Sequence, residues 1–149
     1  MTEPTPSFSI IVPVFALPAQ LAECLEAMSH LRPPPGGFEV IVVDDGSPEA
    51  LDRVTESYRD KLNLTLLRQT NRGPASARNA GSLAARGSLL AFTEADCRPK
   101  PDWLTALAHC FQQTRGQMLG GRTVNSLARN IYAVASQLIL QATYALYRS

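Results

Sequence analysis

The sequence predicts an α/β fold in which helices cover both faces of a mostly parallel sheet. Two observations favour this class. Short runs rich in Val, Ile or Leu alternate four times with stretches of helical spacing. Most of these runs are almost continuously apolar, as in strands that are buried on both faces. The length of 149 residues suits one domain with one core. We therefore predict a single domain over 1–149, with a flexible tail over 1–7.

Each predicted strand is followed by a predicted helix. The strands are Phe8 to Phe15, Phe38 to Val43, Leu64 to Arg68 and Leu89 to Thr93, and a fifth is predicted over 118–124. The apolar residues with helical spacing are Leu21, Cys24, Leu25, Met28 and Leu31, then Leu51, Val54 and Tyr58, then Ala77, Ala80, Gly81 and Ala84, then Leu104, Leu107, Ala108 and Phe111. The small residues of the third helix predict that it approaches the sheet closely.

The stretch 131–147 is apolar around almost the whole circumference of a helix. Such a helix needs cover on most of its surface. Its 17 residues, several of them polar, fall short of the roughly 20 apolar residues of a membrane span. We expect an incomplete domain, in which 127–149 pack on a missing C-terminal half. A homodimer contact or peripheral membrane association through 131–147 are the alternatives.

Charge and cysteine content exclude several classes of protein. The formal net charge is +1 and no run of Lys or Arg is present, which argues against nucleic acid as a partner. Cys24, Cys97 and Cys110 match no zinc or disulfide spacing, which favours a reducing compartment. The N-terminus lacks the basic segment of a signal peptide. We predict a cytoplasmic location, with the inner face of the membrane as an alternative.

Carboxylates follow directly on two of the predicted strands. Asp44 and Asp45 follow the second strand, and Glu94 and Asp96 follow the fourth. In parallel α/β sheets, ligands bind outside the carboxyl ends of the strands. Glu94 and Asp96, two residues apart, can face one point and supply the hard oxygen ligands that Mg²⁺ or Mn²⁺ prefers. Because such ions also bind phosphate oxygens, the expected ligand is a diphosphate carried with its metal.

Each of these groups also has an ordinary structural explanation. Asp44 and Asp45 could form an acidic turn that caps the next helix, and the Glu94 loop could simply be solvated. Arg72 and Arg78 could offset diphosphate charge together with the amides at the start of the third helix, although either could be a surface charge. The location of both acidic clusters at one edge of the sheet favours a binding site.

Four motifs occur in order along the chain. They are Pro13-Val14-Phe15-Ala16, then Val42-Val43-Asp44-Asp45-Gly46-Ser47, then Asn71-Arg72-Gly73-Pro74-Ala75-Ser76-Ala77-Arg78-Asn79-Ala80-Gly81, and finally Glu94-Ala95-Asp96 with Pro101-Asp102-Trp103-Leu104. From Ser9 to about Trp103 the sequence resembles the family 2 glycosyltransferases, which are inverting enzymes with a GT-A fold. The resemblance implies a Rossmann-like sheet of the GT-A type that forms the N-terminal, nucleotide-sugar-binding half of such an enzyme.

The resemblance also implies roles for individual residues. The implied nucleotide-binding residues are Pro13, Val14, Phe15, Asp44, Asp45, Asn71, Gly73 and Arg78. Phe15 stands where the family usually has Tyr, and Ala16 replaces an Asn. Asp96 is the implied main contact to Mg²⁺ or Mn²⁺, with Glu94 in place of the usual Asp. Glu94 keeps the charge but reaches farther by one methylene, which changes the geometry available to the metal.

The implied reaction is the transfer of a sugar from a nucleotide diphosphate sugar, commonly linked to UDP, to an acceptor hydroxyl with inversion. A carboxylate base and the metal would assist it. The implied acceptor is a saccharide or a lipid-linked group of the kind used for cell envelope polysaccharide. The family's base lies in a later Glu-Asp motif, whereas 103–149 contain neither Asp nor Glu. We therefore predict no catalytic residue in this chain and expect the base in a missing C-terminal segment.

Other classes of protein fit less well or stay open. A sugar nucleotidyltransferase would need a Gly-rich basic loop after the first strand, and 13–18 do not form one; the same holds for a dinucleotide-binding domain. A phospho-receiver would carry its acidic pair after the first strand instead of the second. A non-catalytic or degenerate nucleotide-binding module stays open, because it would also lack the base.

Overall fold

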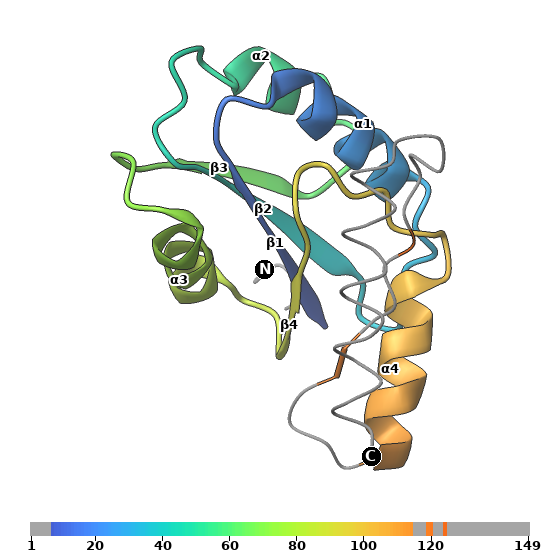
Figure 1. Ribbon diagram of the computed structural model, residues 1–149. Helices are drawn as coiled ribbons and strands as arrows, with labels where there is room; N and C mark the ends of the chain where they lie inside the picture. The colour runs from blue at the N-terminus through green and yellow to red at the C-terminus, as the bar shows by residue number, and fades with distance from the viewer. Residues whose placement is uncertain (1–6, 115–118, 121–123, 125–149) are drawn as a thin grey trace, which may run out of the picture. The chain divides into compact units, whose positions relative to one another are not determined.

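The computed structural model describes residues 7–114, 119, 120 and 124. The chain divides into two compact units, Met1–Arg115 and Gly116–Ser149, and the described helices and strands all lie in the first. They are β1 (Phe8–Val14), α1 (Pro18–Ser29), β2 (Phe38–Asp44), α2 (Asp52–Glu56), β3 (Leu64–Arg68), α3 (Pro74–Ala84), β4 (Leu89–Phe92) and α4 (Trp103–Thr114), as Figure 1 shows.

The four described strands form one sheet in the order β3-β2-β1-β4. Their three pairings are all parallel, which confirms the predicted parallel arrangement. In the register, Val14 pairs with Asp44, and Asp44 pairs with Arg68. The carboxyl ends of the strands therefore lie at one edge of the sheet, where the sequence places its acidic clusters.

Helices cover both faces of the sheet, as predicted. Side chains of β1 and β2 such as Ile10, Val12 and Val40 share one apolar cluster with α1, α2 and α4. Ile41 and Val43 point to the other face and form a smaller cluster with α3. Figure 1 shows α3 on the opposite side of the sheet from α1 and α2. Because successive residues of a strand face opposite sides, an apolar strand such as β2 contributes to both clusters.

The close approach of α3 to the sheet depends on Gly81. A Cβ atom at this position would lie 2.6 Å from Ile11 Cγ2 and 3.1 Å from Val43 Cγ2, and both of these side chains are buried. Ala77 on the same helix is also buried. The predicted approach of the small-residue face to the sheet is confirmed.

Some boundaries differ from the predictions. The second helix, predicted to carry Leu51 and Tyr58, spans only Asp52–Glu56. The amides of Tyr58 and Arg59 donate to carbonyl groups three residues earlier, so the chain continues in tighter turns in which apolar spacing no longer marks an α-helix. β1 ends at Val14 and β4 at Phe92, each one residue earlier than predicted, whereas β2 extends one residue farther.

Several predictions concern residues outside the described part of the chain. These are the tail over 1–7 apart from Ser7, the strand over 118–124 apart from three residues, and the helix over 131–147. The single domain over 1–149 and the packing of 127–149 stay predictions. Among the described residues, no helix combines the length and hydropathy that crossing a bilayer would require.

Candidate functional site

A hollow of about 270 Å³ lies where β1, β2 and β4 end, and we call it the strand-end hollow. It is lined by Pro13, Val14, Phe15, Leu17, Asp45, Pro74, Glu94, Ala95 and Asp96. Six of the predicted site residues line it, namely Pro13, Val14, Phe15, Asp45, Glu94 and Asp96. The structure therefore brings together the acidic clusters that follow β2 and β4, which are about fifty residues apart in the sequence.

Phe15 forms an aromatic wall of the hollow. β1 ends at Val14, and the Phe15 side chain remains 47% exposed. The next residue, Ala16, has a φ of 55°, which L residues rarely adopt. Its amide donates a hydrogen bond to Ser47 Oγ at 2.9 Å. The chain thus turns sharply after β1 and leaves the ring at the surface of the hollow.

Asp45 organises the loop before α3. Its Oδ1 accepts hydrogen bonds from Gln69 Nε2 at 2.7 Å and from the Arg72 amide at 2.9 Å, and its Oδ2 accepts one from the Gly73 amide at 2.8 Å. Burial alone would raise the pKa of Asp45, but the bonds from Arg72, Gln69 and Gly73 outweigh burial and hold the pKa below its ordinary value. Asp45 is therefore an ionised carboxylate near neutral pH.

The predicted loop residues Asn71 and Gly73 lie beside the hollow and do not line it. Gly46 allows the loop to approach the end of β2, because a Cβ atom on Gly46 would lie 2.8 Å from the Asn71 nitrogen and its φ is +80°. The amides of Arg72 and Gly73, just before α3, donate to Asp45. These two amides are therefore engaged by Asp45. That the amides in the first turn of α3 hold a diphosphate stays a prediction.

Asp44 lies inside the turn and does not line the hollow. Its residue is 1% exposed, and its Oδ1 accepts the Ser47 amide at 2.8 Å. Arg68 Nε lies 3.5 Å from its Oδ2, which accepts no hydrogen bond within the described part of the chain. These contacts fit the alternative of a structural acidic turn, which the sequence analysis left open. That Asp44 contacts a nucleotide directly stays a prediction, and the buried position of Asp44 does not support it.

Glu94 and Asp96 lie in a turn after β4. The Cys97 amide donates to the Glu94 carbonyl at 3.1 Å and closes this turn, while the intervening Ala95 is buried. Both carboxylates are exposed and line the hollow. No group of three or more His, Cys, Asp or Glu side chains that could hold a metal occurs among the described residues. Two carboxylates fit an ion of the Mg²⁺ type, which completes its coordination with water and phosphate oxygens.

Arg78 reaches Glu94 from α3. Its guanidinium Nη2 donates to Glu94 Oε1 in an ion pair, and Arg78 does not line the hollow. The sequence had placed Arg78 near a diphosphate; in the structure, its contact is with a carboxylate of the hollow. The added methylene of Glu94, relative to an Asp, lengthens the reach of the carboxylate that makes this contact.

Cys24, in α1, also contacts the turn that carries Glu94 and Asp96. Its thiol donates to the Glu94 carbonyl at 3.6 Å. Burial raises the pKa of Cys24 to about 12, with smaller contributions from Cys97 and Asp96. Cys24 therefore stays a neutral thiol. Cys24 and Cys97 are free thiols.

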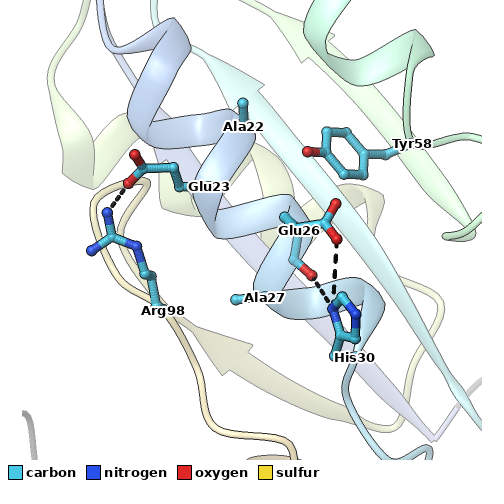
Figure 2. Close-up of a pocket in the computed structure, with 7 residues that line it drawn as sticks. All are labelled: Ala22, Glu23, Glu26, Ala27, His30, Tyr58 and Arg98. Carbon is cyan, nitrogen blue, oxygen red and sulfur yellow. Dashed lines mark hydrogen bonds and ion pairs between the residues drawn. The ribbon is translucent and has the colours of Figure 1, made fainter.

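A larger hollow of about 480 Å³ lies along the outer side of α1 (Figure 2). It is lined by Ala22, Glu23, Glu26, Ala27, His30, Tyr58 and Arg98. Glu23 forms an ion pair with Arg98, two residues after Asp96, and so ties α1 to the turn that carries the carboxylates. Burial and the adjacent Glu26 raise the pKa of Tyr58. This hollow contains none of the predicted site residues, and we assign it no binding role.

Sequence reasoning assigned no site role to Leu17, Ser47 or Gln69, which shape the strand-end hollow. Leu17 lines it, Ser47 binds the Ala16 amide, and Gln69 binds Asp45. Ser47 belongs to the second motif and Gln69 stands two residues before the third, so proximity to the motifs was the available signal. Their partners lie 31 and 24 residues away, a relationship that local patterns do not contain.

A parallel sheet whose strand ends combine an exposed aromatic side chain with carboxylates is compatible with a sheet of the GT-A type. The family model described as glycosyl transferase family 2 matches residues 9–148, so the chain is a member of that family. This confirms the family and the fold that the four motifs predicted.

Three relatives illustrate the similarity. Glycosyltransferase AglE of Haloferax volcanii is 31% identical over 124 residues, which cover 81% of this chain and 40% of AglE. Staphylococcus aureus TarS 1–349, solved in complex with UDP-GlcNAc, matches with a TM-score of 0.68 and 30% identity over 79% of this chain and 36% of that one. The mannosyltransferase PcManGT from Pyrobaculum calidifontis, solved with GDP-Man and Mn²⁺, matches with a TM-score of 0.67 and 27% identity. This match covers 73% of this chain and 33% of PcManGT. The chain thus spans less than half of each relative.

Proposed function

We propose that this chain binds a nucleotide diphosphate sugar in the strand-end hollow, as the donor-binding part of a glycosyltransferase. The observation that carries the proposal is the convergence of Phe15, Asp45 and the Glu94–Asp96 turn on one hollow of about 270 Å³. An aromatic wall suits a base, an ionised carboxylate suits a base N–H, and two further carboxylates suit a metal that accompanies a diphosphate.

Asp45 suits a base with a ring N–H donor, such as uracil. A carboxylate offers about four acceptor positions on its two oxygens. The loop uses two positions on Oδ1 and one on Oδ2, which leaves one on Oδ2. A uracil ring carries an imide N–H that can donate to this position. This argument and the UDP-GlcNAc bound by TarS support UDP as the carrier of the sugar.

Asp96 and Glu94 would hold the Mg²⁺ or Mn²⁺ ion, and PcManGT, with which this chain shares its fold, was solved with Mn²⁺. When bound, such an ion offsets negative charge on the leaving nucleoside diphosphate. The chain's own contribution is to place both carboxylates on the lining of one hollow. Burial of Ala95 and the hydrogen bond from the Cys97 amide stabilise the turn that carries them, and Arg78 forms an ion pair with Glu94.

The reaction we propose is sugar transfer with inversion to the hydroxyl of a saccharide or lipid-linked acceptor. No Asp or Glu occurs over 103–149, so we assign this chain donor binding and no catalytic base. A cytoplasmic location, at the inner face of a membrane where a lipid-linked acceptor would lie, is part of the same proposal.

Calorimetric titration and thermal melting test donor binding. We expect UDP with Mn²⁺ to bind more tightly and to raise the melting temperature more than UDP in EDTA does, because the metal links the diphosphate to Asp96 and Glu94. GDP and ADP with Mn²⁺ serve as matched controls for the base. Absence of any binding of UDP, GDP or ADP with Mn²⁺ would contradict the proposal.

A non-catalytic nucleotide-binding module is the second candidate, and the lack of acidic residues over 103–149 favours it. Incubation with UDP-sugars, Mn²⁺ and a panel of saccharide acceptors separates the two. Release of UDP with formation of a glycoside supports the transferase. Tight donor binding without release, in this chain and in any longer form of it, supports the module. Family membership disfavours the sugar nucleotidyltransferase.

A further inference from the structure

Ser47 ties together the ends of three neighbouring strands. Its hydroxyl oxygen accepts the Ala16 amide at 2.9 Å, its own amide donates to Asp44 Oδ1 at 2.8 Å, and its carbonyl accepts Arg68 Nη2 at 2.8 Å. Ala16 follows β1, Asp44 ends β2 and Arg68 ends β3. Ser47 is 3% exposed and does not line the strand-end hollow. It therefore acts through its hydrogen bonds to these three strand ends.

The backbone of Ala16 needs to be held in place. Its φ of 55° lies in the left-handed region, which costs an L residue free energy and persists only where neighbouring contacts impose it. The bond from the Ala16 amide to Ser47 Oγ is such a contact. Phe15 directly precedes Ala16 and is 47% exposed, so the direction of its ring depends on this backbone as well as on packing.

We propose that Ser47 is a positioning residue for the nucleotide base: through the Ala16 amide it holds Phe15 in place as the wall of the strand-end hollow. The proposal rests on the proposed function, since it requires that the hollow binds a nucleotide. It assigns Ser47 no contact with the donor. The Glu94–Asp96 turn is fixed by other contacts, from Cys97 and Cys24, and does not depend on Ser47.

Two probes separate the base from the diphosphate. UMP in EDTA reports on the base and its wall, and Mn²⁺ with inorganic pyrophosphate reports on the carboxylate turn. Loss of one hydrogen bond predicts that Ser47→Ala weakens UMP binding about 3- to 10-fold and changes the affinity for Mn²⁺–pyrophosphate by less than about 2-fold. Ser47→Thr, which keeps an acceptor oxygen, restores the affinity for UMP.

Ser29→Ala is the matched control. Ser29 is half-buried and its hydroxyl donates to the Glu26 carbonyl at 2.7 Å, but it lies at the end of α1. We expect it to bind both probes as the parent does. If Ser47→Ala does not fold, as judged by circular dichroism, Ser47→Cys replaces it, because sulfur is a weak acceptor of similar shape.

The outcomes distinguish the two proposals. If the parent chain binds neither UMP nor UDP with Mn²⁺, the proposed function fails. If the parent binds UMP and Ser47→Ala, or Ser47→Cys in its place, binds it equally well, the positioning role is wrong. The positioning role is also wrong if that variant loses affinity for UMP and for Mn²⁺–pyrophosphate to the same degree, because that result indicates general disruption of the fold.

Discussion

Asp45 Oδ2 accepts a hydrogen bond of 2.8 Å from the Gly73 amide, which joins the residue after β2 to the residue before α3. Gly73 has a φ of 87°, so the chain enters the helix through a conformation that favours glycine. The carboxylate therefore has two tasks: it fixes the entry of α3 and it faces the strand-end hollow. A change at Asp45 should affect stability and nucleotide binding together.

Asp45→Asn tests this double role. An amide group can accept bonds on only one atom, and its NH₂ would oppose the amide of Arg72 or of Gly73. We expect a loss of about 1–3 kcal/mol in the free energy of unfolding, measured by urea denaturation. UMP binding, measured by calorimetry at a temperature where the variant is folded, should weaken as well. Asp52→Asn, an exposed change in α2, is the control and should alter neither quantity.

Glu94→Gln tests the carboxylate turn. Glu94 and Arg78 are both partly exposed, so the loss of their ion pair costs about 0–1 kcal/mol of stability. Loss of a metal-facing carboxylate should instead reduce the gain in UDP affinity that Mn²⁺ provides, by about tenfold. UMP binding in EDTA should not change. Glu56→Gln, which breaks an exposed ion pair with Arg59, is the matched control. An unchanged Mn²⁺ effect in the Glu94 variant would remove this residue from the metal site.

Gly81→Ala tests the contact between α3 and the sheet. The added methyl group meets Ile11 Cγ2 at 2.6 Å and Val43 Cγ2 at 3.1 Å, both on buried side chains that have little room to move. Overpacking of this kind costs about 1–3 kcal/mol, whereas the same change on an exposed helix surface would stabilise. Leu83→Ala, at a residue of the same helix that is 90% exposed, should stay within about 0.5 kcal/mol of the parent in urea denaturation.

The fold could be predicted because its determinants are local. The apolar runs of β1 and β2 and the spacing of Leu21, Cys24, Leu25 and Met28 on α1 express burial directly in the sequence. The parallel order then brings the acidic clusters to one edge. The second helix was predicted too long, because the apolar spacing of Leu51 and Tyr58 is also compatible with successive tight turns.

The candidate site was predicted less completely, because its geometry depends on contacts between distant residues. The pairing of Arg78 with Glu94 depends on how closely α3 packs, which Gly81 controls. Ala16 has a positive φ, which a sequence usually signals with a glycine. At Ala16 that signal is absent, and the conformation is accompanied by a hydrogen bond to the distant Ser47. Residue types and motif order thus indicated candidate side chains, while tertiary contacts decide which of them face the hollow.

A buried carboxylate near the amino end of β2, away from the strand-end hollow, predicts how the free energy of unfolding depends on pH. Glu39, in β2, accepts bonds from Ser9 Oγ at 2.6 Å, from the Arg86 amide at 2.7 Å and from Arg86 Nε at 2.9 Å. Burial alone would raise the pKa of Glu39, but the bonds from Ser9 and Arg86 outweigh burial and lower it. Because the folded pKa lies below the unfolded value of about 4.3, the native state favours the ionised form. The resulting stability is present above that value and is lost as the pH falls through the folded pKa.

Glu39→Gln should therefore lower the free energy of unfolding near neutral pH by about 1–3 kcal/mol, because the amide cannot satisfy Ser9 and Arg86 together. Below about pH 5 the parent loses its advantage progressively, so the stability curves of parent and variant should converge in acid. Urea denaturation over a series of pH values measures both curves. Glu49→Gln, at an exposed position, should follow the parent throughout. Curves for parent and Glu39→Gln that run parallel into acid would show that the Glu39 carboxylate does not titrate with folding, and that its contacts act through shape alone.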